Sequence, residues 1–238
     1  MVRSISLIMP AYNEEDTLRF SVVSACEKLR QHRFDYEIFI FDDASTDKTG
    51  KIADRLAIRN EKIKVIHNAR NMNLGFNFAR GIEMASKEYT GLLPCGGQIA
   101  VESFDNFLPA LLMADITVTH ISNPEARPLV RNIISRINVQ LVNWLFGLNL
   151  KYYHLNFYRT DILKKIPTST KSYALMVELL VHAVKSGASF VEIPIFLRKR
   201  ESGKSKALRP KNIVNILKTY ARLFMQVMIL RKRIDLGR

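Results

Sequence analysis

The sequence predicts an α/β protein in which a mostly parallel sheet is flanked by helices and followed by an amphipathic C-terminal helix. In the first half of the chain, short β-rich runs alternate with helix-like segments, a pattern that builds parallel βαβ units. Polar clusters at 10–15, 42–47 and 94–98 follow three of these runs, where open α/β sheets bind ligands. The last forty residues combine apolar positions at helical spacing with a basic excess.

Five strands are expected in the first half, because each run is rich in β-branched and aromatic residues. These strands are 4–9, 36–41, 62–66, 89–93 and 115–119. The helices between them are expected at 15–31, 46–59 and 77–87. The second half is less regular, with helices expected at 128–147, 173–185 and 210–233 and an extended segment at 189–196.

The composition excludes several classes of protein. With 238 residues, of which 47% are hydrophobic, the chain can bury a core and is too apolar to be disordered. Cys26 and Cys95 are too few for a disulfide framework or a zinc finger, and they indicate free thiols in a reducing compartment. No window of about 18 residues is free of charge, so no transmembrane helix is expected, and the start of the chain does not fit a signal peptide.

The charge is strongly positive and unevenly placed. The chain has 36 Lys and Arg against 22 Asp and Glu, a formal net charge of +14. Residues 199–238 hold 12 of these cations and two of the acids. A basic segment of this kind implies a polyanionic partner: a nucleic acid, an anionic membrane surface or a phosphorylated substrate.

The polar cluster after the second strand contains three acids. Carboxylates at this edge of a parallel sheet can accept hydrogen bonds from ribose hydroxyls and a base N–H. Asp42 and Asp43 come directly after a buried strand, where two acids repel each other, so a ligand is favoured over a plain polar loop. Asp47 fits a charge at a helix N-terminus equally well.

Several motifs together resemble the family 2 glycosyltransferases, which have the GT-A fold, and within them the polyprenyl-phosphate glycosyltransferases of the dolichol-phosphate mannose synthase type. PAYNEE at 10–15 resembles the opening nucleotide-binding loop, and DDASTDKT at 42–49 the pattern DDxSxDxT. Residues 73–81 resemble NxGxxxAxxxG, and VEIPI at 191–195 with RESGKSKAL at 200–208 resembles EVPI…RxxGxSK. The order and separation of these motifs make the signal specific.

The resemblance implies a GT-A domain over residues 1–208, with the basic amphipathic helix of residues 209–238 beyond it. It also implies sugar transfer from a nucleoside-diphosphate sugar. The donor-binding residues that it implies are Pro10, Ala11, Tyr12, Asn13, Glu14, Asp42, Asp43 and Gln98.

The chain departs from the family at its usual Asp-x-Asp metal motif. Gln98 and Glu102 keep the register of the motif, which puts Pro94 and Gly96 where the two acids belong. Mg²⁺ and Mn²⁺ need carboxylate oxygens, which these residues lack, so no metal site is assigned although either ion remains an option. Glu102 fits either a lone ligand or the first turn of a helix, and the helix is favoured.

Cations can replace a metal beside a departing diphosphate, because the role is electrostatic. The family resemblance places a basic loop over the pyrophosphate and the acceptor phosphate, and we therefore assign the catalytic cations to it. These residues are Arg198, Arg200, Lys204 and Lys206. A solvated basic loop is the alternative interpretation.

The acceptor side is less well defined. Residues 153–163 resemble the family block GFxLYRxxxL, which assigns Arg159 to the acceptor side, and Ser205 is assigned there too. The acid that often precedes this block is missing. A phosphate acceptor is already anionic and needs no general base, whereas a sugar hydroxyl does. His154 could be such a base, although a structural role is favoured for it.

The C-terminal helix at 210–233 has a wide apolar face with a basic border, which fits a helix lying on anionic lipid. A core-packing or dimer-forming helix fits equally well, so a homo-oligomer is a further option. The helix at 128–147 presents the same alternatives. We expect a cytoplasmic protein bound peripherally to the cytoplasmic face of a membrane.

Three functional hypotheses follow from the sequence. The first is an inverting glycosyltransferase that moves a sugar from a nucleoside-diphosphate sugar to an acceptor, most simply a polyprenyl phosphate. The second is a catalytically silent GT-A protein that binds or scaffolds after losing its metal acids. The third, binding of nucleic acid by the basic tail, is disfavoured because no basic motif interleaved with aromatic residues is present.

Overall fold

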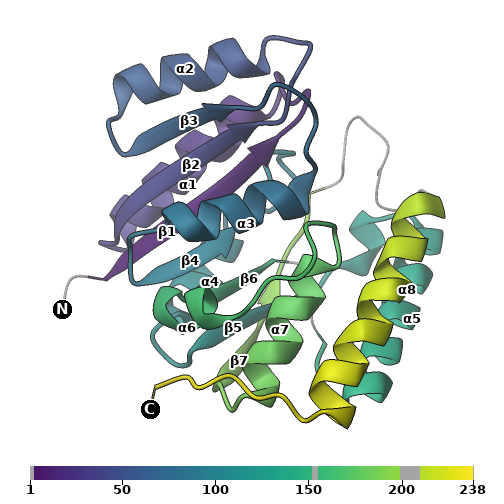
Figure 1. Ribbon diagram of the computed structural model, residues 1–238. Helices are drawn as coiled ribbons and strands as arrows, with labels where there is room; N and C mark the ends of the chain where they lie inside the picture. The colour runs from purple at the N-terminus through teal and green to yellow at the C-terminus, as the bar shows by residue number, and fades with distance from the viewer. Residues whose placement is uncertain (1–2, 152–154, 199–209, 238) are drawn as a thin grey trace.

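The fold is one seven-stranded sheet covered by helices on both faces (Figure 1). The computed structural model describes residues 3–151, 155–198 and 210–237, with side chains from residue 214 onward in the last segment. Within these ranges the strand order is β3-β2-β1-β4-β6-β5-β7. The bounds are β1 Ser4–Ala11, β2 Asp35–Asp42, β3 Ile63–His67, β4 Tyr89–Leu92, β5 Ile116–Ile121, β6 Asn156–Arg159 and β7 Phe190–Ile195.

All neighbouring strands pair in parallel except at β6, which is antiparallel to both β4 and β5. The five strands expected in the first half are confirmed to within about two residues, because their runs are rich in β-branched and aromatic residues. The central strands β1 and β2 are buried on both faces, as parallel strands commonly are. In β1, for example, Leu7 and Met9 enter one core and Ile8 enters the other. Strand β6 lies in a segment for which the sequence predicted no strand.

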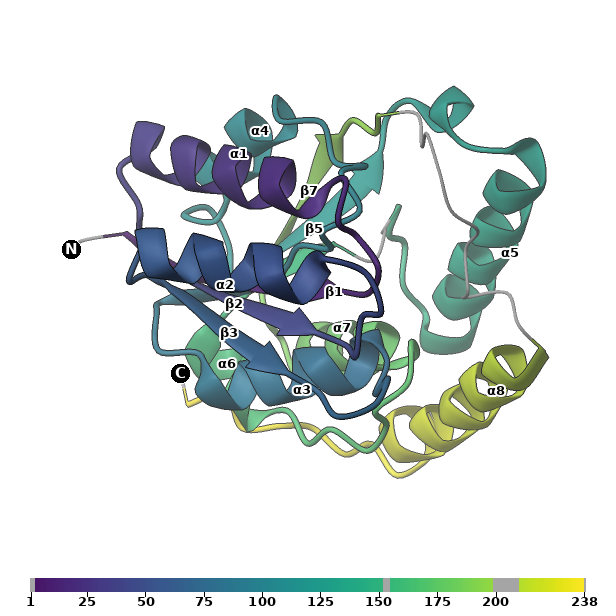
Figure 2. The same cartoon turned by 90° about the horizontal axis from the view of Figure 1, so that it is seen from above.

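Two hydrophobic cores lie on opposite faces of the sheet, and each is closed by its own helices (Figure 2). Helices α1, α2 and α4 cover one face, whereas α3, α6 and α7 cover the other. Their bounds are α1 Leu18–Gln31, α2 Thr49–Arg59, α4 Ser103–Ala110, α3 Leu74–Met84, α6 Thr160–Lys165 and α7 Leu175–Lys185.

Two further helices, α5 (Leu129–Phe146) and α8 (Pro210–Phe224), lie side by side beyond the sheet on the α7 side (Figures 1 and 2). The Tyr220 hydroxyl of α8 donates a hydrogen bond to Asn138 Oδ1 of α5 at 2.9 Å. A 3₁₀ turn at Pro124–Ala126 precedes α5, and a π-helical turn at Met225–Ile229 follows α8. No helix in the described part of the chain has the length and apolarity to cross a bilayer.

Candidate functional site

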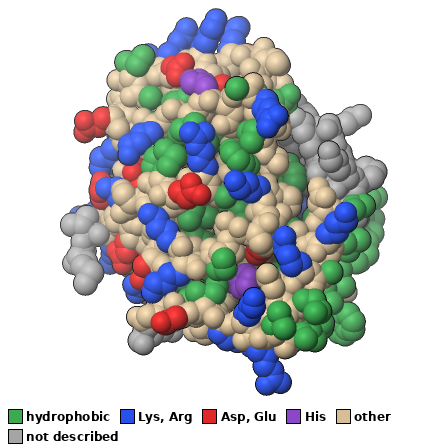
Figure 3. Space-filling view, viewed as in Figure 1, with side chains coloured by type: hydrophobic (Ala, Val, Ile, Leu, Met, Phe, Trp, Pro, Cys, Tyr) green, Lys and Arg blue, Asp and Glu red, His purple; other side chains and the backbone are tan. Residues whose placement is uncertain are grey.

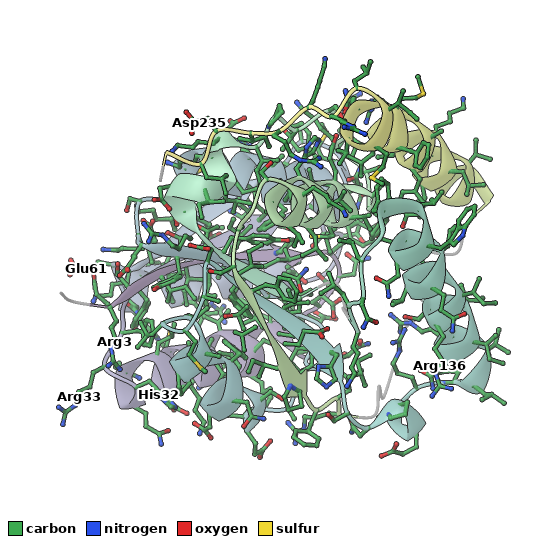
Figure 4. The ribbon with its side chains drawn as sticks, turned by 90° about the horizontal axis from the view of Figure 1, so that it is seen from below. Arg3, His32, Arg33, Glu61, Arg136 and Asp235 are labelled. Atoms are coloured by element: carbon green, nitrogen blue, oxygen red, sulfur yellow. The ribbon has the colours of Figure 1, made fainter. Side chains whose placement is uncertain are left out.

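The carboxyl ends of β1, β2 and β3 meet at one edge of the sheet, because the three strands are parallel and in register. Ala11 pairs with Asp42, and Asp42 pairs with His67. The amino ends of the same strands form the opposite edge. Figure 4 shows Arg3, Arg33 and Glu61, which precede β1, β2 and β3, together at that edge, with Arg136 of α5 on the other side of the molecule.

Side-chain hydrogen bonds join the loops after β1 and β2 into one unit. The Asn13 backbone N–H donates to Ser45 Oγ at 3.1 Å, and Asn13 Oδ1 accepts from the Thr46 N–H at 2.8 Å. Both Asn13 and Ala44 have positive φ values, 54° and 61°, which turn the two loops toward each other. The segments 10–15 and 42–49, predicted separately from the sequence, therefore form one continuous surface.

The Asp42 carboxylate is held by groups of the protein itself. Its Oδ1 accepts from the Ser45 N–H at 3.0 Å, and its Oδ2 lies 2.9 Å from His67 Nδ1. His67 Nε2 lies 3.0 Å from Asp54 Oδ1 on the other side of the ring. Hydrogen bonds to Asp42 and Asp54 raise the pKa of His67 above its ordinary value. The sequence analysis did not single out His67, although it directly follows the third expected strand, at the edge where the acidic cluster was expected.

Asp43 is buried and anchors the next loop. Its Oδ1 accepts from Asn68 Nδ2 at 2.9 Å and from the Met72 N–H at 2.8 Å, and its Oδ2 accepts from the Asn73 N–H at 3.0 Å. Asn73 in turn caps α3, because its Oδ1 accepts from the Phe76 N–H at 3.2 Å. The charge that the sequence analysis assigned to a ligand thus organises residues 68–73.

Asp47 makes the contacts of a residue at a helix start. Its Oδ1 accepts from the N–H of Thr49, the first residue of α2, at 2.9 Å, and its Oδ2 accepts from the Glu15 N–H at 3.2 Å. Burial works to raise the pKa of Asp47, but hydrogen bonds from Thr49 and Glu15 outweigh it, and the pKa is lowered. These contacts are those expected for a negative charge at the N-terminus of a helix.

The loop after β4 runs beside the loop after β1. Cys95 is buried, its N–H donates to the Pro10 carbonyl at 3.4 Å, and burial raises the pKa of its thiol. Gly96 faces Glu14: a Cβ placed on Gly96 would lie 3.5 Å from Glu14 Oε1. A carboxylate from the neighbouring loop thus approaches the position where the sequence analysis expected the second metal acid of the family.

The described residues do not fit a metal site. They contain no group of three His, Cys, Asp or Glu side chains placed to hold an ion. Pro94 and Gly96 supply no side-chain oxygen, and Glu14 is a single carboxylate that also accepts from Thr17 Oγ1 at 3.1 Å. Glu102 is the N-cap residue of α4, one position before the first turn in which the helix interpretation placed it.

The segment after β7 begins at this edge of the sheet. The Arg198 N–H donates to the Gln98 carbonyl at 2.7 Å, which ties the loop after β4 to the start of the basic loop. The Arg198 guanidinium lies 5.0 Å from the centroid of the Phe20 ring on α1, a cation–π contact. Four other residues assigned to the basic loop lie outside the described part of the chain, namely Arg200, Lys204, Ser205 and Lys206. His154 lies outside it too.

Arg159 does not lie with these loops. It pairs with Tyr89, the first residue of β4, and so lies at the opposite edge of the sheet. Its guanidinium makes two hydrogen bonds to the Asp161 carboxylate, at 3.1 and 2.8 Å, which occupy its planar fork. The sequence block that suggested Arg159 gave no sign that its strand runs antiparallel to β4. This direction places the carboxyl end of β6, and Arg159 with it, at the edge opposite the carboxyl ends of the parallel strands.

Comparison with known proteins agrees with this geometry. Residues 6–99 match the family described as glycosyl transferase family 2. The polyprenol monophosphomannose synthase of Mycolicibacterium smegmatis is 28% identical over 217 residues, which cover 84% of this chain and 79% of that protein. The undecaprenyl-phosphate mannosyltransferase of Micrococcus luteus is 27% identical over 211 residues, covering 84% and 85%.

Among solved structures, the chain resembles glucosyl-3-phosphoglycerate synthase from Mycobacterium tuberculosis, crystallised with Mg²⁺ and uridine diphosphate. The TM-score is 0.66 at 16% identity, over 94% of this chain and 79% of that one. The likeness establishes the fold. Residues 6–99 therefore form a glycosyl transferase family 2 domain, and the chain is a glycosyltransferase with the GT-A fold.

Proposed function

We propose that this protein transfers a sugar, with inversion, from a nucleoside-diphosphate sugar to a polyprenyl phosphate at a membrane surface. The observation that carries the proposal is the joining of the loops after β1 and β2 through Asn13, Ser45 and Thr46. A surface held in this way is organised before a ligand arrives, which lowers the entropy cost of binding. Similarity to a polyprenol monophosphomannose synthase and an undecaprenyl-phosphate mannosyltransferase supports the acceptor class.

The donor nucleotide would lie on this joined surface. Pro10, Ala11, Tyr12, Asn13, Glu14 and Gln98 are the proposed contacts. Because Asp42 and Asp43 already hold Ser45, His67 and residues 68–73, we assign them the role of shaping the loops that meet the nucleotide.

The proposed reaction is an in-line displacement at the anomeric carbon. An oxygen of the acceptor phosphate forms the new bond to carbon as the bond to the diphosphate breaks, and the nucleoside diphosphate leaves. The acceptor phosphate is already anionic at neutral pH, so the step needs no general base. Attack opposite the leaving group inverts the configuration.

Charge on the leaving diphosphate would be balanced by the basic loop. Arg198 begins this loop, and its backbone bond to Gln98 holds the start of the loop at the edge with the nucleotide motifs. Arg200, Lys204 and Lys206 follow it in the sequence and are proposed to contact the diphosphate, and Ser205 is proposed to contact the acceptor phosphate. Arg198 would leave the face of Phe20 to take part.

The exposed apolar side chains of α5 and α8 are proposed to meet the membrane. Figure 3 shows hydrophobic side chains gathered on the side of the molecule where α8 lies. We name this surface the α5/α8 face, and its exposed members are Leu129, Val130, Ile133, Ile134, Ile137, Trp144, Val214 and Leu217. A contiguous exposed apolar surface bordered by cations fits anionic lipid.

The activity is tested by incubating the protein with nucleotide-sugars and a short polyprenyl phosphate, with and without EDTA. We expect sugar transfer that survives EDTA, because Pro94 and Gly96 cannot bind a metal. Transfer that appears only with added Mn²⁺ would contradict the proposal that the basic loop balances the charge of the leaving diphosphate. Acceptors with a sugar hydroxyl in place of the phosphate are the control, and we expect no transfer to them because they need a general base.

A catalytically silent protein is the second candidate, and the same Pro94 and Gly96 favour it. Tight binding of a nucleotide-sugar without transfer to any acceptor would support it. The paired change Pro94→Asp with Gly96→Asp tests it further, because a carboxylate introduced at the second position would lie beside Glu14. We expect this variant to show a Mn²⁺-dependent rise in Tm that the Gly96→Ala control lacks. Turnover gained only in the paired variant would favour the silent protein.

A further inference from the structure

A cavity of about 310 Å³ lies between the start of α3, residues 170–172 and α8. Three cations line it, Lys171, Lys218 and Arg222, together with hydroxyl and amide side chains that include Ser172 and Asn73. None of the described residues that line it carries a carboxylate. Three positive charges with neutral hydrogen-bonding groups form an environment that attracts a multiply charged anion.

The three cations differ in how much of their charge is already balanced. Arg222 Nη2 lies 3.7 Å from Oε1 of Glu178, which is itself buried and accepts N–H bonds from Ser169 and Thr170. Lys171 Nζ lies 5.0 Å from the centroid of the Phe76 ring. Lys218 has no hydrogen-bond or ion-pair partner among the described residues. At least one full charge therefore remains available to a ligand.

The start of α3 adds to the positive potential of the cavity. Asn73, the cap of this 11-residue helix, is one of the lining residues. Helix α3 begins in close contact with residues 170–172, because a Cβ on Gly75 would lie 2.0 Å from the Ser172 carbonyl oxygen. The positive end of the helix dipole thus points toward the wall that carries Lys171.

The cavity lies between the α5/α8 face and the edge of the sheet where the carboxyl ends of β1, β2 and β3 meet. On one side, the Asn73 N–H is bonded to Asp43, which belongs to the edge described above. On the other side, the lining residues Asn215, Lys218, Thr219 and Arg222 follow helical spacing along one face of α8. The adjoining face of the same helix carries the exposed Val214 and Leu217.

We propose that this cavity binds the phosphate monoester of a lipid-linked ligand, whose hydrocarbon chain runs along the apolar face of α8. A monoester carries more negative charge than a phosphodiester and presents three oxygens to donors, which suits a cavity lined by three cations and several hydroxyl and amide groups. The inference rests on the proposed function, because it takes the lipid to reach the protein over the α5/α8 face.

The test measures binding of the full chain to phosphatidylcholine vesicles that contain phosphatidic acid, a monoester, or phosphatidylglycerol, a diester, at matched zeta potential. We expect Lys218→Gln to weaken binding to the monoester vesicles by about fivefold or more, the effect of one lost charged hydrogen bond, and to leave diester binding nearly unchanged. Lys232→Gln, an exposed cation outside the cavity, is expected to weaken both equally. Equal effects of Lys218→Gln on both vesicles would overturn the proposal.

Lys171→Gln repeats the test from the other wall and guards against a folding defect in α8. Inorganic phosphate separates the two sources of a phosphate group. Millimolar phosphate that competes with monoester vesicles in the wild type supports the site, whereas Lys218-dependent binding of inorganic phosphate without any preference for monoester lipid overturns the lipid assignment.

Sugar transfer is measured on the same preparations. If sugar is transferred but Lys218→Gln does not change lipid binding, this inference alone is overturned. If Lys218→Gln weakens binding to monoester lipid but no sugar is transferred, only the proposed function is overturned.

Discussion

At the scale of single residues, the acids after β2 act on the protein before they act on any ligand. Asp43 is 4% exposed and accepts three hydrogen bonds, all from residues 68–73. A buried carboxylate must have its oxygens satisfied by donors, and here the donors all come from one loop. The loop after β3 therefore depends on one side chain.

We predict that Asp43→Asn lowers the free energy of unfolding by about 2–3 kcal/mol, since the amide turns a donor toward groups that are themselves donors. Urea denaturation measures the change. Asp54→Asn is the control, because the Asp54 side chain is 53% exposed and contacts only His67 among the ion pairs described; it should cost less than about 1 kcal/mol. Similar losses in the two variants would contradict the anchoring role.

His67 makes the stability of the site depend on pH. Its pKa is raised in the folded protein by Asp42 and Asp54, so folding favours the protonated ring. The resulting stabilisation is fully present below the unfolded pKa of about 6.5 and is lost as the pH rises through the higher folded pKa.

We therefore predict that the difference in unfolding free energy between wild type and His67→Gln is larger at pH 6 than at pH 9. Urea denaturation at a series of pH values measures it. Because the ring is half exposed, the effect should be modest. A difference that grows with pH would contradict the assignment.

At the scale of elements, β6 decides how the sheet continues beyond β4. It pairs antiparallel with both β4 and β5 and packs so closely that Gly91 has no room for a side chain. A Cβ on Gly91 would lie 2.0 Å from the buried Phe157 ring. The Phe157 ring is stacked on Phe107 of α4, with 4.4 Å between centroids, so it has little freedom to move.

We predict that Gly91→Ala costs about 3 kcal/mol or more, because overpacking displaces either the ring or the strand. Gly96→Ala is the matched control, since a Cβ there meets Glu14 only at ordinary contact distance. Thermal unfolding of both variants measures the difference. Equal Tm values would show that Phe157 can relax without cost.

At the scale of the whole molecule, the helices divide between two tasks. Helices α1 to α4, α6 and α7 cover the sheet, whereas α5 and α8 bury one side and leave the other exposed. Leu223 and Val227 enter the core, and Leu217 on another face of the same segment is 52% exposed. This division leaves an apolar face of α5 and α8 exposed, as the proposed membrane contact requires.

We predict that Trp144→Glu reduces partitioning onto anionic vesicles by about tenfold or more, since an aromatic side chain is lost from the contact and a like charge is added. Trp144 is 79% exposed, so its replacement should leave Tm unchanged. Ile58→Glu is the control, because Ile58 is 85% exposed on α2, away from the α5/α8 face. Co-sedimentation measures both, and equal losses would contradict this face as the contact.

Much of the fold and part of the site could be predicted from local patterns. The strands and the three polar clusters after them follow from residues close in sequence, and parallel pairing brings those clusters to one edge. The missing metal acids at Pro94 and Gly96 were also visible from the sequence. The strand β6 was not, because four residues carry too weak a periodicity.

The sequence by itself determined the class of the fold, the edge where the three polar clusters gather and the absence of carboxylates at Pro94 and Gly96, since each depends on residue type and short spacing. Only the tertiary structure decided that Asp42 and Asp43 hold their own loops, that Arg159 lies at the far edge, and that Lys171, Lys218 and Arg222 line one cavity. The packing of the whole chain sets the direction in which strands pair and which distant segments come together. Neither can be predicted from residues that are close in the sequence.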